Sequence, residues 1–180
     1  MRFLIFLFLI SLNAYSQNNY DKVIFNIISD ISKERIKDDI VTLANFGTRH
    51  TLSDTVSNER GIGAARRWIK KTFESISEDC NNCLEVFDQK NYFKKNNLRL
   101  IKDVWINNVV AIQRGSKYPN RYVLMSGDID SRVSDPNDFI SDSPGANDNA
   151  SGMAGTIEAA RVLSKHKFDN SIVYVGLSGE

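Results

Sequence analysis

Four acidic residues in the last third of the sequence stand where strands are expected to end and a helix to begin. Asp128 and Asp130 come shortly after a short apolar run, and Glu180 comes shortly after a second one. Asp148 lies between the two runs, at the start of a stretch with helical spacing of apolar residues. In open α/β sheets, ligands bind outside the carboxyl ends of the strands. The spacing therefore predicts that the four carboxylates meet at one edge of a sheet.

Carboxylates that meet in this way favour a bound metal ion. Like charges packed together repel one another, and a divalent cation removes the conflict. Two cations about 3.5–4 Å apart, bridged by one carboxylate, recur in hydrolytic enzymes. Taken singly, each acid has an ordinary role: Asp148 as a helix cap, the two aspartates after the first run as turn formers, and Glu180 as a solvated end. Their joint placement favours the metal site.

Three sequence blocks around these acids resemble the co-catalytic zinc aminopeptidases of metallopeptidase family twenty-eight, which include secreted bacterial leucyl-type enzymes. The family patterns are G-H-x-D-S, P-G-A-x-D-N-A-S-G and S-G-E-E. The matching blocks are Leu124–Arg132 (LMSGDIDSR), Pro144–Gly152 (PGANDNASG) and Val175–Glu180 (VGLSGE). Weaker echoes occur at 47–49 and 64–65. The resemblance implies that the chain is the N-terminal portion of a secreted bacterial member, truncated after Glu180. It also implies an α/β three-layer sandwich around a mostly parallel central sheet.

The resemblance also implies a role for each acid. Asp148 corresponds to the residue that bridges two zinc ions, and Glu180 to the general base that activates the bridging water. Asp130 corresponds to the carboxylate that orients the first metal ligand. That ligand is His in the family, and Asp128 stands in its place here. Aspartate binds zinc through oxygen, yet its added negative charge makes the site more favourable for Mg²⁺ or Mn²⁺.

Part of the family's ligand set has no counterpart in the sequence. The chain stops at Glu180, before the second Glu of the third block, and the family's later Asp or Glu and its final His are absent. His50, in an early loop, and His166, in a Lys-His-Lys helix end, do not fit as substitutes. We therefore expect the front portion of a longer enzyme, and no appreciable activity from the 180 residues alone.

The function expected from these residues is that of a secreted zinc-dependent aminopeptidase, which hydrolyses N-terminal bonds of peptides or proteins through a metal-activated water. Asp128 favours one alternative, a non-catalytic extracellular binding domain of the same fold. A glutaminyl cyclase-like enzyme is the other alternative, but those enzymes usually lack the N-A-S-G continuation that follows Asp148. The sequence assigns neither a residue specificity nor an oligomeric state.

Hydrophobic periodicity predicts the helices and strands that position the acids. Helices are predicted at 19–32, 33–45, 58–77 and 148–165, and strands at 84–92, 97–105, 107–113, 122–125 and 171–177. The continuous apolar run 122–125 predicts a strand that is buried on both faces. Together with the helix and strand that follow, it predicts two parallel strands joined by a right-handed crossover.

Composition and the N-terminal segment limit the remaining possibilities. The 180 residues are 42% hydrophobic and 25% charged, with a formal net charge of +1, so neither nucleic acid nor an anionic membrane is an expected partner. Residues 1–16 read as a secretory signal peptide cleaved before Gln17, because the apolar run 3–12 is too short to span a membrane. Residues 17–180 are then the N-terminal part of one domain.

The only two cysteines, Cys80 and Cys83, form a C-x-x-C pair between a predicted helix and a predicted strand. In an exported chain such a pair most simply forms a local disulfide. A redox-active motif favours the opposite order of elements, and a zinc knuckle needs a second pair. We predict a structural disulfide.

Overall fold

The computed structural model describes residues 22–96 and 100–179. Contacts divide the chain after Ile31 into two units, and the second unit begins at Ser32. In the first unit, residues 22–29 are helical, inside the predicted helix 19–32. The predicted signal peptide, residues 1–16, lies outside the described residues. Within the described part, no helix is both long and apolar enough to cross a membrane.

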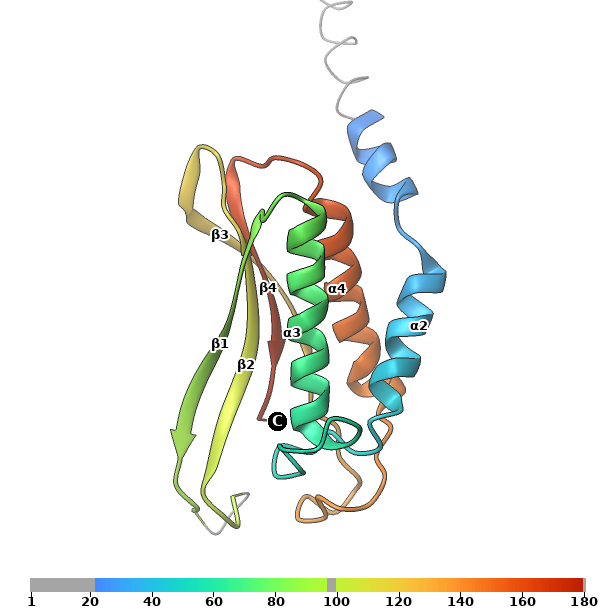
Figure 1. Cartoon of the computed structure of the whole chain (residues 1–180), viewed down its shortest axis with the longest axis vertical. Helices are drawn as coiled ribbons and strands as arrows, with labels where there is room; N and C mark the ends of the chain where they lie inside the picture. Colours follow the sequence, from blue (N-terminus) through green and yellow to red (C-terminus); the bar gives the residue numbers. More distant parts are fainter. Residues whose placement is uncertain (1–21, 97–99, 180) are drawn as a thin grey trace, which may run out of the picture. The chain divides into compact units, whose positions relative to one another are not determined.

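A four-stranded sheet organises the second unit (Figure 1). Its strands are β1 (Leu84–Phe93), β2 (Val104–Gln113), β3 (Tyr118–Asp128) and β4 (Asn170–Leu177), in the spatial order β1-β2-β4-β3. The strands β3 and β4 are parallel, as predicted, and the other two pairings are antiparallel. The α/β class is confirmed. The part of the sheet that is described is mixed, because the β1–β2 hairpin adds antiparallel pairings to the parallel strand–helix–strand unit.

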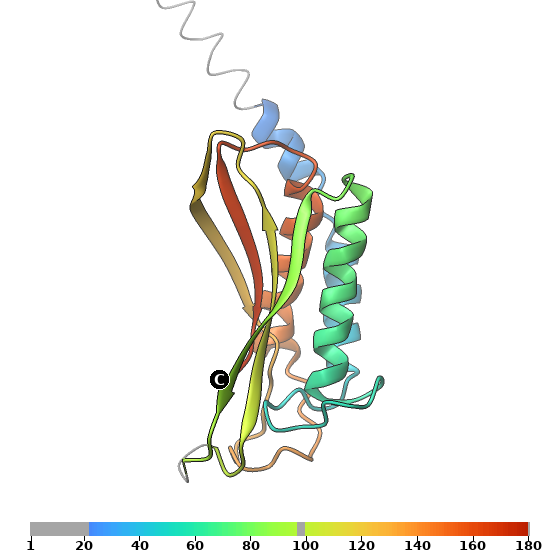
Figure 2. The same cartoon turned by 60° about the vertical axis from the view of Figure 1, so that its left-hand side comes forward.

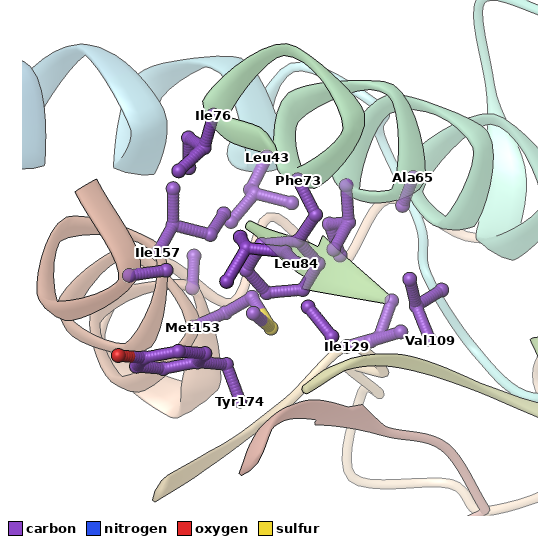
Figure 3. Packing of buried hydrophobic residues seen from close by; sticks show 14 of the residues in the cluster. Leu43, Ala65, Phe73, Ile76, Leu84, Val109, Ile129, Met153, Ile157 and Tyr174 are labelled. Carbon is purple, nitrogen blue, oxygen red and sulfur yellow. The ribbon is translucent and has the colours of Figure 1, made fainter. Parts of the chain in front are cut away.

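Three helices lie on the same side of this sheet in both views (Figures 1 and 2). They are α2 (Lys33–Ala44), α3 (Gly61–Asp79) and α4 (Ser151–Leu163). The predicted apolar stripes of α3 and α4 are buried and meet over the sheet (Figure 3). Fully buried members of this core are Ala65, Ile69, Phe73, Val109, Met153, Ile157 and Tyr174. Their burial places α4, and with it the segment around Asp148, against the carboxyl ends of β3 and β4.

One continuous strand replaces the two strands predicted at 97–105 and 107–113. Residues 100–103 lie outside β2, and 97–99 are not among the described residues. The predicted break fell at Asn107-Asn108, a polar pair that the sheet accommodates. The Asn107 side chain donates to Asp88 at 3.2 Å, and the Asn108 side chain donates to Gln89 at 2.7 Å. Because both partners lie on β1, the amides join the two strands.

The prediction that 122–125 is buried on both faces is wrong. Tyr122, Val123 and Leu124 remain 53%, 52% and 62% exposed. Their strand β3 stands at the edge of the sheet, and among the described strands it pairs only with β4. An apolar run indicates that a strand tends to be buried. It does not indicate which part of the protein covers the strand.

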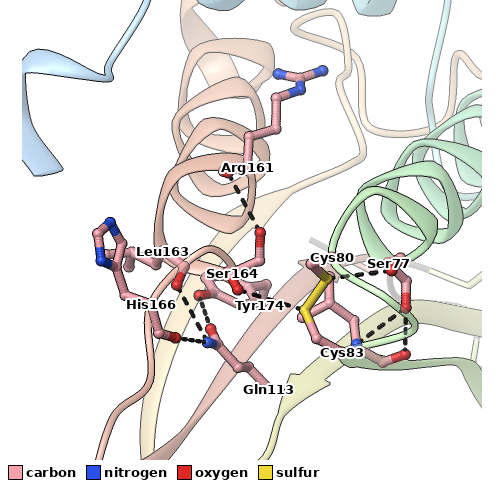
Figure 4. The surroundings of a disulfide bond; sticks show 10 residues. Ser77, Cys80, Cys83, Gln113, Arg161, Leu163, Ser164, His166 and Tyr174 are labelled. Atoms are coloured by element: carbon pink, nitrogen blue, oxygen red, sulfur yellow. Dashed lines mark hydrogen bonds between the residues drawn. A yellow bond between two sulfur atoms is a disulfide. The ribbon is translucent and has the colours of Figure 1, made fainter.

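The predicted disulfide is confirmed (Figure 4). Cys80 and Cys83, with Cα atoms 5.4 Å apart, close the turn between α3 and β1. Ser77 reinforces the turn, because its hydroxyl donates to the Leu84 carbonyl at 2.9 Å and accepts from the Leu84 N–H at 3.1 Å. The cysteines therefore fix how α3 enters the first strand.

Candidate active site

The carboxyl ends of β3 and β4 lie side by side, and α4 begins directly beside them. Asp128, the last residue of β3, is in register with Leu177 of β4, and Gly127 is in register with Gly176. A Cβ atom at Gly127 would lie 2.4 Å from the backbone nitrogen of Met153. Glycine is required here because the first turn of α4 presses onto the strand. The predicted convergence of strand ends and helix start is thus present.

Asp130 is buried and joins two segments that are distant in sequence. It is 5% exposed, and its Oδ2 accepts a hydrogen bond from the Thr51 hydroxyl at 2.8 Å. The same oxygen accepts a second hydrogen bond, from the Gly179 N–H at 3.1 Å. Glu180 itself lies outside the described residues. Its position in the chain directly follows the amide that Asp130 holds.

Three hydrogen bonds hold Ser178 in place. Its backbone N–H donates to the Asn108 side-chain oxygen at 2.8 Å, and its hydroxyl donates to the Asn107 carbonyl at 3.0 Å. The Arg66 Nε donates to the same hydroxyl at 3.3 Å. Together with the Asp130 contact, these bonds hold the two residues that precede Glu180 against β2 and α3.

Asp148 lies in an irregular turn, Ala146–Ala150, and not inside the predicted helix 148–165. Its backbone is extended, with φ −124° and ψ 96°, and the residue is exposed. The helix-cap alternative is wrong, because α4 begins at Ser151 and its cap residue, Ala150, makes no side-chain capping bond. Asp148 is therefore not occupied in stabilising the helix.

Asn149 connects the Asp148 segment to Asp128. Its side-chain NH₂ donates to Asp128 Oδ2 at 3.2 Å, and its side-chain oxygen accepts from the Gly152 N–H at 2.8 Å. Asp128 is half-buried. The structure thus brings Asp128 together with the direct neighbour of Asp148, and Asp130 with the direct neighbour of Glu180.

Arg49 is a buried support of the site that sequence reasoning noted only as a family echo. Its guanidinium donates to four backbone carbonyls, at 2.7–3.0 Å; these belong to Leu43, Ile129, Pro144 and Gly145. Burial lowers the Arg49 pKa to about 10, and the charge of Asp130 opposes part of that shift. The side chain fixes the loop that leads to Asp148 against the chain that follows β3.

The two histidines do not take part in the acidic cluster. His50 is buried, its Nε2 lies 3.0 Å from the Pro136 carbonyl, and its Nδ1 accepts from the Leu52 N–H at 3.0 Å. Both ring nitrogens thus have protein partners. His166 follows the carboxyl end of α4, the end remote from Asp148.

The ligand chemistry of Asp128 and Asp148 fits a divalent cation. Carboxylate oxygens bind zinc and also the harder cations Mg²⁺ and Mn²⁺. Catalytic zinc sites use three protein ligands. Across residues 22–96 and 100–179, no three His, Cys, Asp or Glu side chains are grouped so that they would hold a metal ion. The described residues therefore do not form a complete ligand set by themselves.

Comparisons with known proteins agree with this geometry. Residues 108–180, which contain β3, α4, β4 and the acidic cluster, match the model of Peptidase family M28. A probable zinc metalloprotease of Pyrenophora teres f. teres is 41% identical over 162 residues, which cover 89% of this chain and 35% of that protein. One from Leptosphaeria maculans is 42% identical over 154 residues, which cover 86% of this chain and 36% of that protein. The chain thus spans about a third of the length of these relatives.

Solved structures show the same fold. A leucine aminopeptidase precursor from Bacteroides thetaiotaomicron has a TM-score of 0.64 at 16% identity, covering 83% of this chain and 48% of that one. A glutaminyl cyclase from Fimbriiglobus ruber has a TM-score of 0.63 at 17% identity, covering 83% and 46%. The sequence relatives named above are fungal, so a bacterial origin stays a prediction. Through residues 108–180, the segment that carries the acidic cluster, the chain is similar to peptidase family M28.

Proposed function

We propose that the complete protein is an exported zinc-dependent aminopeptidase that removes residues from the N-terminus of peptides or proteins. One observation carries the proposal. The ends of β3 and β4 and the start of α4 meet, and they bring Asp128 next to Asn149 and Asp130 next to Gly179. This is the region that matches the peptidase family, and two of its acids, Asp128 and Asp148, have ligand chemistry suited to a metal ion.

Each acid has a role in the proposed reaction. Asp128 and Asp148 would hold the metal, together with ligands that the family resemblance places after Glu180. When bound, zinc lowers the pKa of a water molecule and polarises the scissile carbonyl. Glu180 takes the proton of the attacking water and returns it to the leaving amine. Asp130 keeps the segment before Glu180 in place through the Gly179 amide.

Measurements on the complete protein test this function directly. We expect two zinc ions per chain and chelator-sensitive cleavage of a leucyl anilide. A binding domain would carry no stoichiometric metal and release no product. A glutaminyl cyclase would convert an N-terminal glutaminyl peptide to its pyroglutamyl form and leave the anilide intact. Either result would replace the aminopeptidase proposal.

Two further expectations belong to the same proposal. Residues 1–16 are removed on export, so the mature protein should begin at Gln17, which N-terminal sequencing of the secreted protein checks. Residues 17–180 alone should not cleave the anilide, because Asp128 and Asp148 are fewer ligands than a catalytic zinc site needs. Robust chelator-sensitive cleavage by that segment would show that the ligand assignment is incomplete.

A further inference from the structure

A cavity lies beside the proposed catalytic segment, between the N-terminal half of α3 and the strands β1 and β2. Its volume is about 560 Å³. Four of the side chains that line it are positive and one is negative. The charged lining residues are Arg66, Arg67, Lys70, Lys90 and Asp88, and Trp105 forms an aromatic part of the wall. The lining therefore has a net positive charge.

Arg66 is the unusual member of this lining. It is 6% exposed, and its Nε donates to the Ser178 hydroxyl. Its Nη2 is completely buried and has no hydrogen-bond partner among the residues that the structure describes. A buried donor without a partner costs on the order of 1–3 kcal/mol, and more when it is charged. Such a group is normally satisfied by a ligand, an ion or water.

The charge of Arg66 is also incompletely balanced. Burial lowers the Arg66 pKa to about 10, although the negative charges of Asp130 and Asp88 act in the opposite direction. The Asp88 carboxylate is already engaged, because it accepts from Lys70 Nζ at 2.7 Å and from the Asn107 amide at 3.2 Å. At neutral pH Arg66 is still a cation, so an anion in the cavity would gain its attraction.

The other positive side chains of the lining differ from Arg66, and one of them, Lys90, is exposed. Arg67 donates to three backbone carbonyls of the preceding loop, those of Thr55, Val56 and Ser57. Lys70 is paired with Asp88. Arg66 is therefore the group in this cavity that combines burial, charge and a free donor. Its contact with Ser178, two residues before Glu180, places the cavity next to the segment that carries the proposed base.

We propose that this cavity binds a carboxylate of the peptide substrate, with Arg66 as the recognition residue. The proposal rests on the aminopeptidase function. In that reaction the N-terminal residue of the substrate lies at the metal, so the carboxylate must belong to the leaving part of the peptide. A guanidinium matches a carboxylate geometrically and electrostatically. The enzyme should therefore prefer peptides whose carboxylate reaches Arg66 while the N-terminal peptide bond lies at the metal.

Matched substrates test this on the complete protein. A series Leu-(Gly)n, with one to four glycines, is assayed with a free C-terminal carboxylate and with a C-terminal amide. At one or two lengths, kcat/KM should favour the acid by about tenfold or more, the effect of one charge-assisted hydrogen bond. In Arg66→Gln the ratio should fall to about one, and Arg66→Lys should keep part of it. Lys71→Gln, which removes an exposed charge from the same helix outside the cavity, should keep the ratio of the parent.

The ratio separates recognition from general damage. Loss of fold or of catalysis lowers kcat/KM for the acid and the amide together and leaves their ratio unchanged. An acid-to-amide ratio near one at every length in the parent, or an unchanged ratio in Arg66→Gln, would overturn the proposal.

Calorimetric binding of the same peptides gives an answer that does not need turnover. A protein without peptidase activity that still binds the acid form more tightly, through Arg66, would contradict the aminopeptidase function and retain the carboxylate site. Equal binding of acid and amide, with binding of inorganic phosphate that depends on Arg66, would instead show a phosphate site and overturn the assignment to a substrate carboxylate.

Discussion

Asp130 is the residue through which the loop at Thr51 and the end of β4 are joined. Both contacts use the same oxygen, Oδ2, so removal of one donor alters how the carboxylate holds the other. Thr51→Val keeps the size of the side chain and removes the hydroxyl. In the complete enzyme we expect kcat to fall by about tenfold, the usual effect of a hydrogen bond to a charged group, with KM little changed. Thr51→Ser should restore kcat, and a failure to do so would show that packing alone matters.

The roles proposed for Glu180 and Asp148 can be separated by two conservative substitutions. Glu180→Gln removes the base and keeps the shape of the side chain. Turnover of a leucyl anilide should fall by about 10²–10⁴, the contribution of a positioned acid–base group, while the metal content stays the same. Asp148→Asn should lose metal, because the bridging charge is gone. Intact turnover in Glu180→Gln would rule out its assignment as the base.

Asp128 stands where the family has histidine, and its contact with Asn149 orients it toward the Asp148 segment. If Asp128 is a ligand, Asp128→Ala should lose about one metal ion per chain in a two-metal site. Asp135→Ala, which removes an exposed carboxylate from the following loop, is the matched control and should keep both ions. Equal metal contents in the two variants would remove Asp128 from the ligand set.

Sequence reasoning pointed to the acids of the candidate site because a carboxylate at the end of a predicted element is visible in a local pattern. It missed the roles of Thr51 and Arg66. The contacts that define those roles join residues 79 and 112 positions apart in the chain. No periodicity or spacing marks such a pair. Arg49 is similar, because nothing in its neighbourhood indicates that its guanidinium is buried under four carbonyls.

At the scale of elements, α2 and α4 are fastened by a network of charges that is largely buried. Arg35 binds both oxygens of Glu158, at 2.5 and 3.0 Å, and the Ser32 N–H donates to the same carboxylate at 2.8 Å. Arg161 binds both oxygens of Asp39, at 2.5 and 3.0 Å. The Glu158 side chain is 3% exposed. These pairs set the position of α4, and hence of the turn that carries Asp148.

The network makes stability depend on pH. Burial alone would raise the Glu158 pKa, but the bonds from Arg35 and Ser32 lower it below its ordinary value. A carboxylate whose pKa is lower in the folded state stabilises fully above its unfolded pKa, about 4.3, and loses that contribution as the pH falls through its folded pKa. We therefore expect the parent to lose stability below about pH 4.3, and Glu158→Gln to lose less over the same range.

At neutral pH, Glu158→Gln should lower the free energy of unfolding by about 3 kcal/mol, because it leaves a partly buried guanidinium without its charge partner. Urea unfolding of the complete protein measures the change. Glu34→Gln removes an exposed carboxylate, 3.8 Å from Lys33, and should change stability by less than about 1 kcal/mol. Similar losses in both variants would show that burial of the network adds little.

Hydrophobic periodicity predicted a helix or strand well where the residues that cover it belong to the described part of the chain. The stripe of α3 and the buried side of α4 were found because each faces the sheet, so one side is apolar. The start of α4 was placed three residues too early, because the turn Ala146–Ala150 has no distinct pattern. The exposure of β3 was missed because strand order is set by pairing between distant segments, and an apolar run alone does not reveal it.

On the scale of the whole molecule, the sheet has one covered face and one that is open in the described residues. Register places Phe87, Tyr122, Leu124 and Leu177 on the face opposite the helices, and they are 41%, 53%, 62% and 36% exposed. The same strand β3 offers an unpaired edge among the described strands. Apolar area of this kind, next to a free edge, favours association with another chain.

The 180-residue chain produced alone should therefore self-associate at micromolar concentration, as size-exclusion chromatography with light scattering would measure. Leu124→Lys places a charge in the middle of the exposed edge strand and should shift the chain toward the monomer, because charged side chains on an edge oppose strand pairing. Val56→Lys adds the same charge at an 84% exposed loop position outside the strands and should leave association unchanged. A monomeric parent, or equal effects of the two lysines, would show that the open face and edge of the sheet do not drive association.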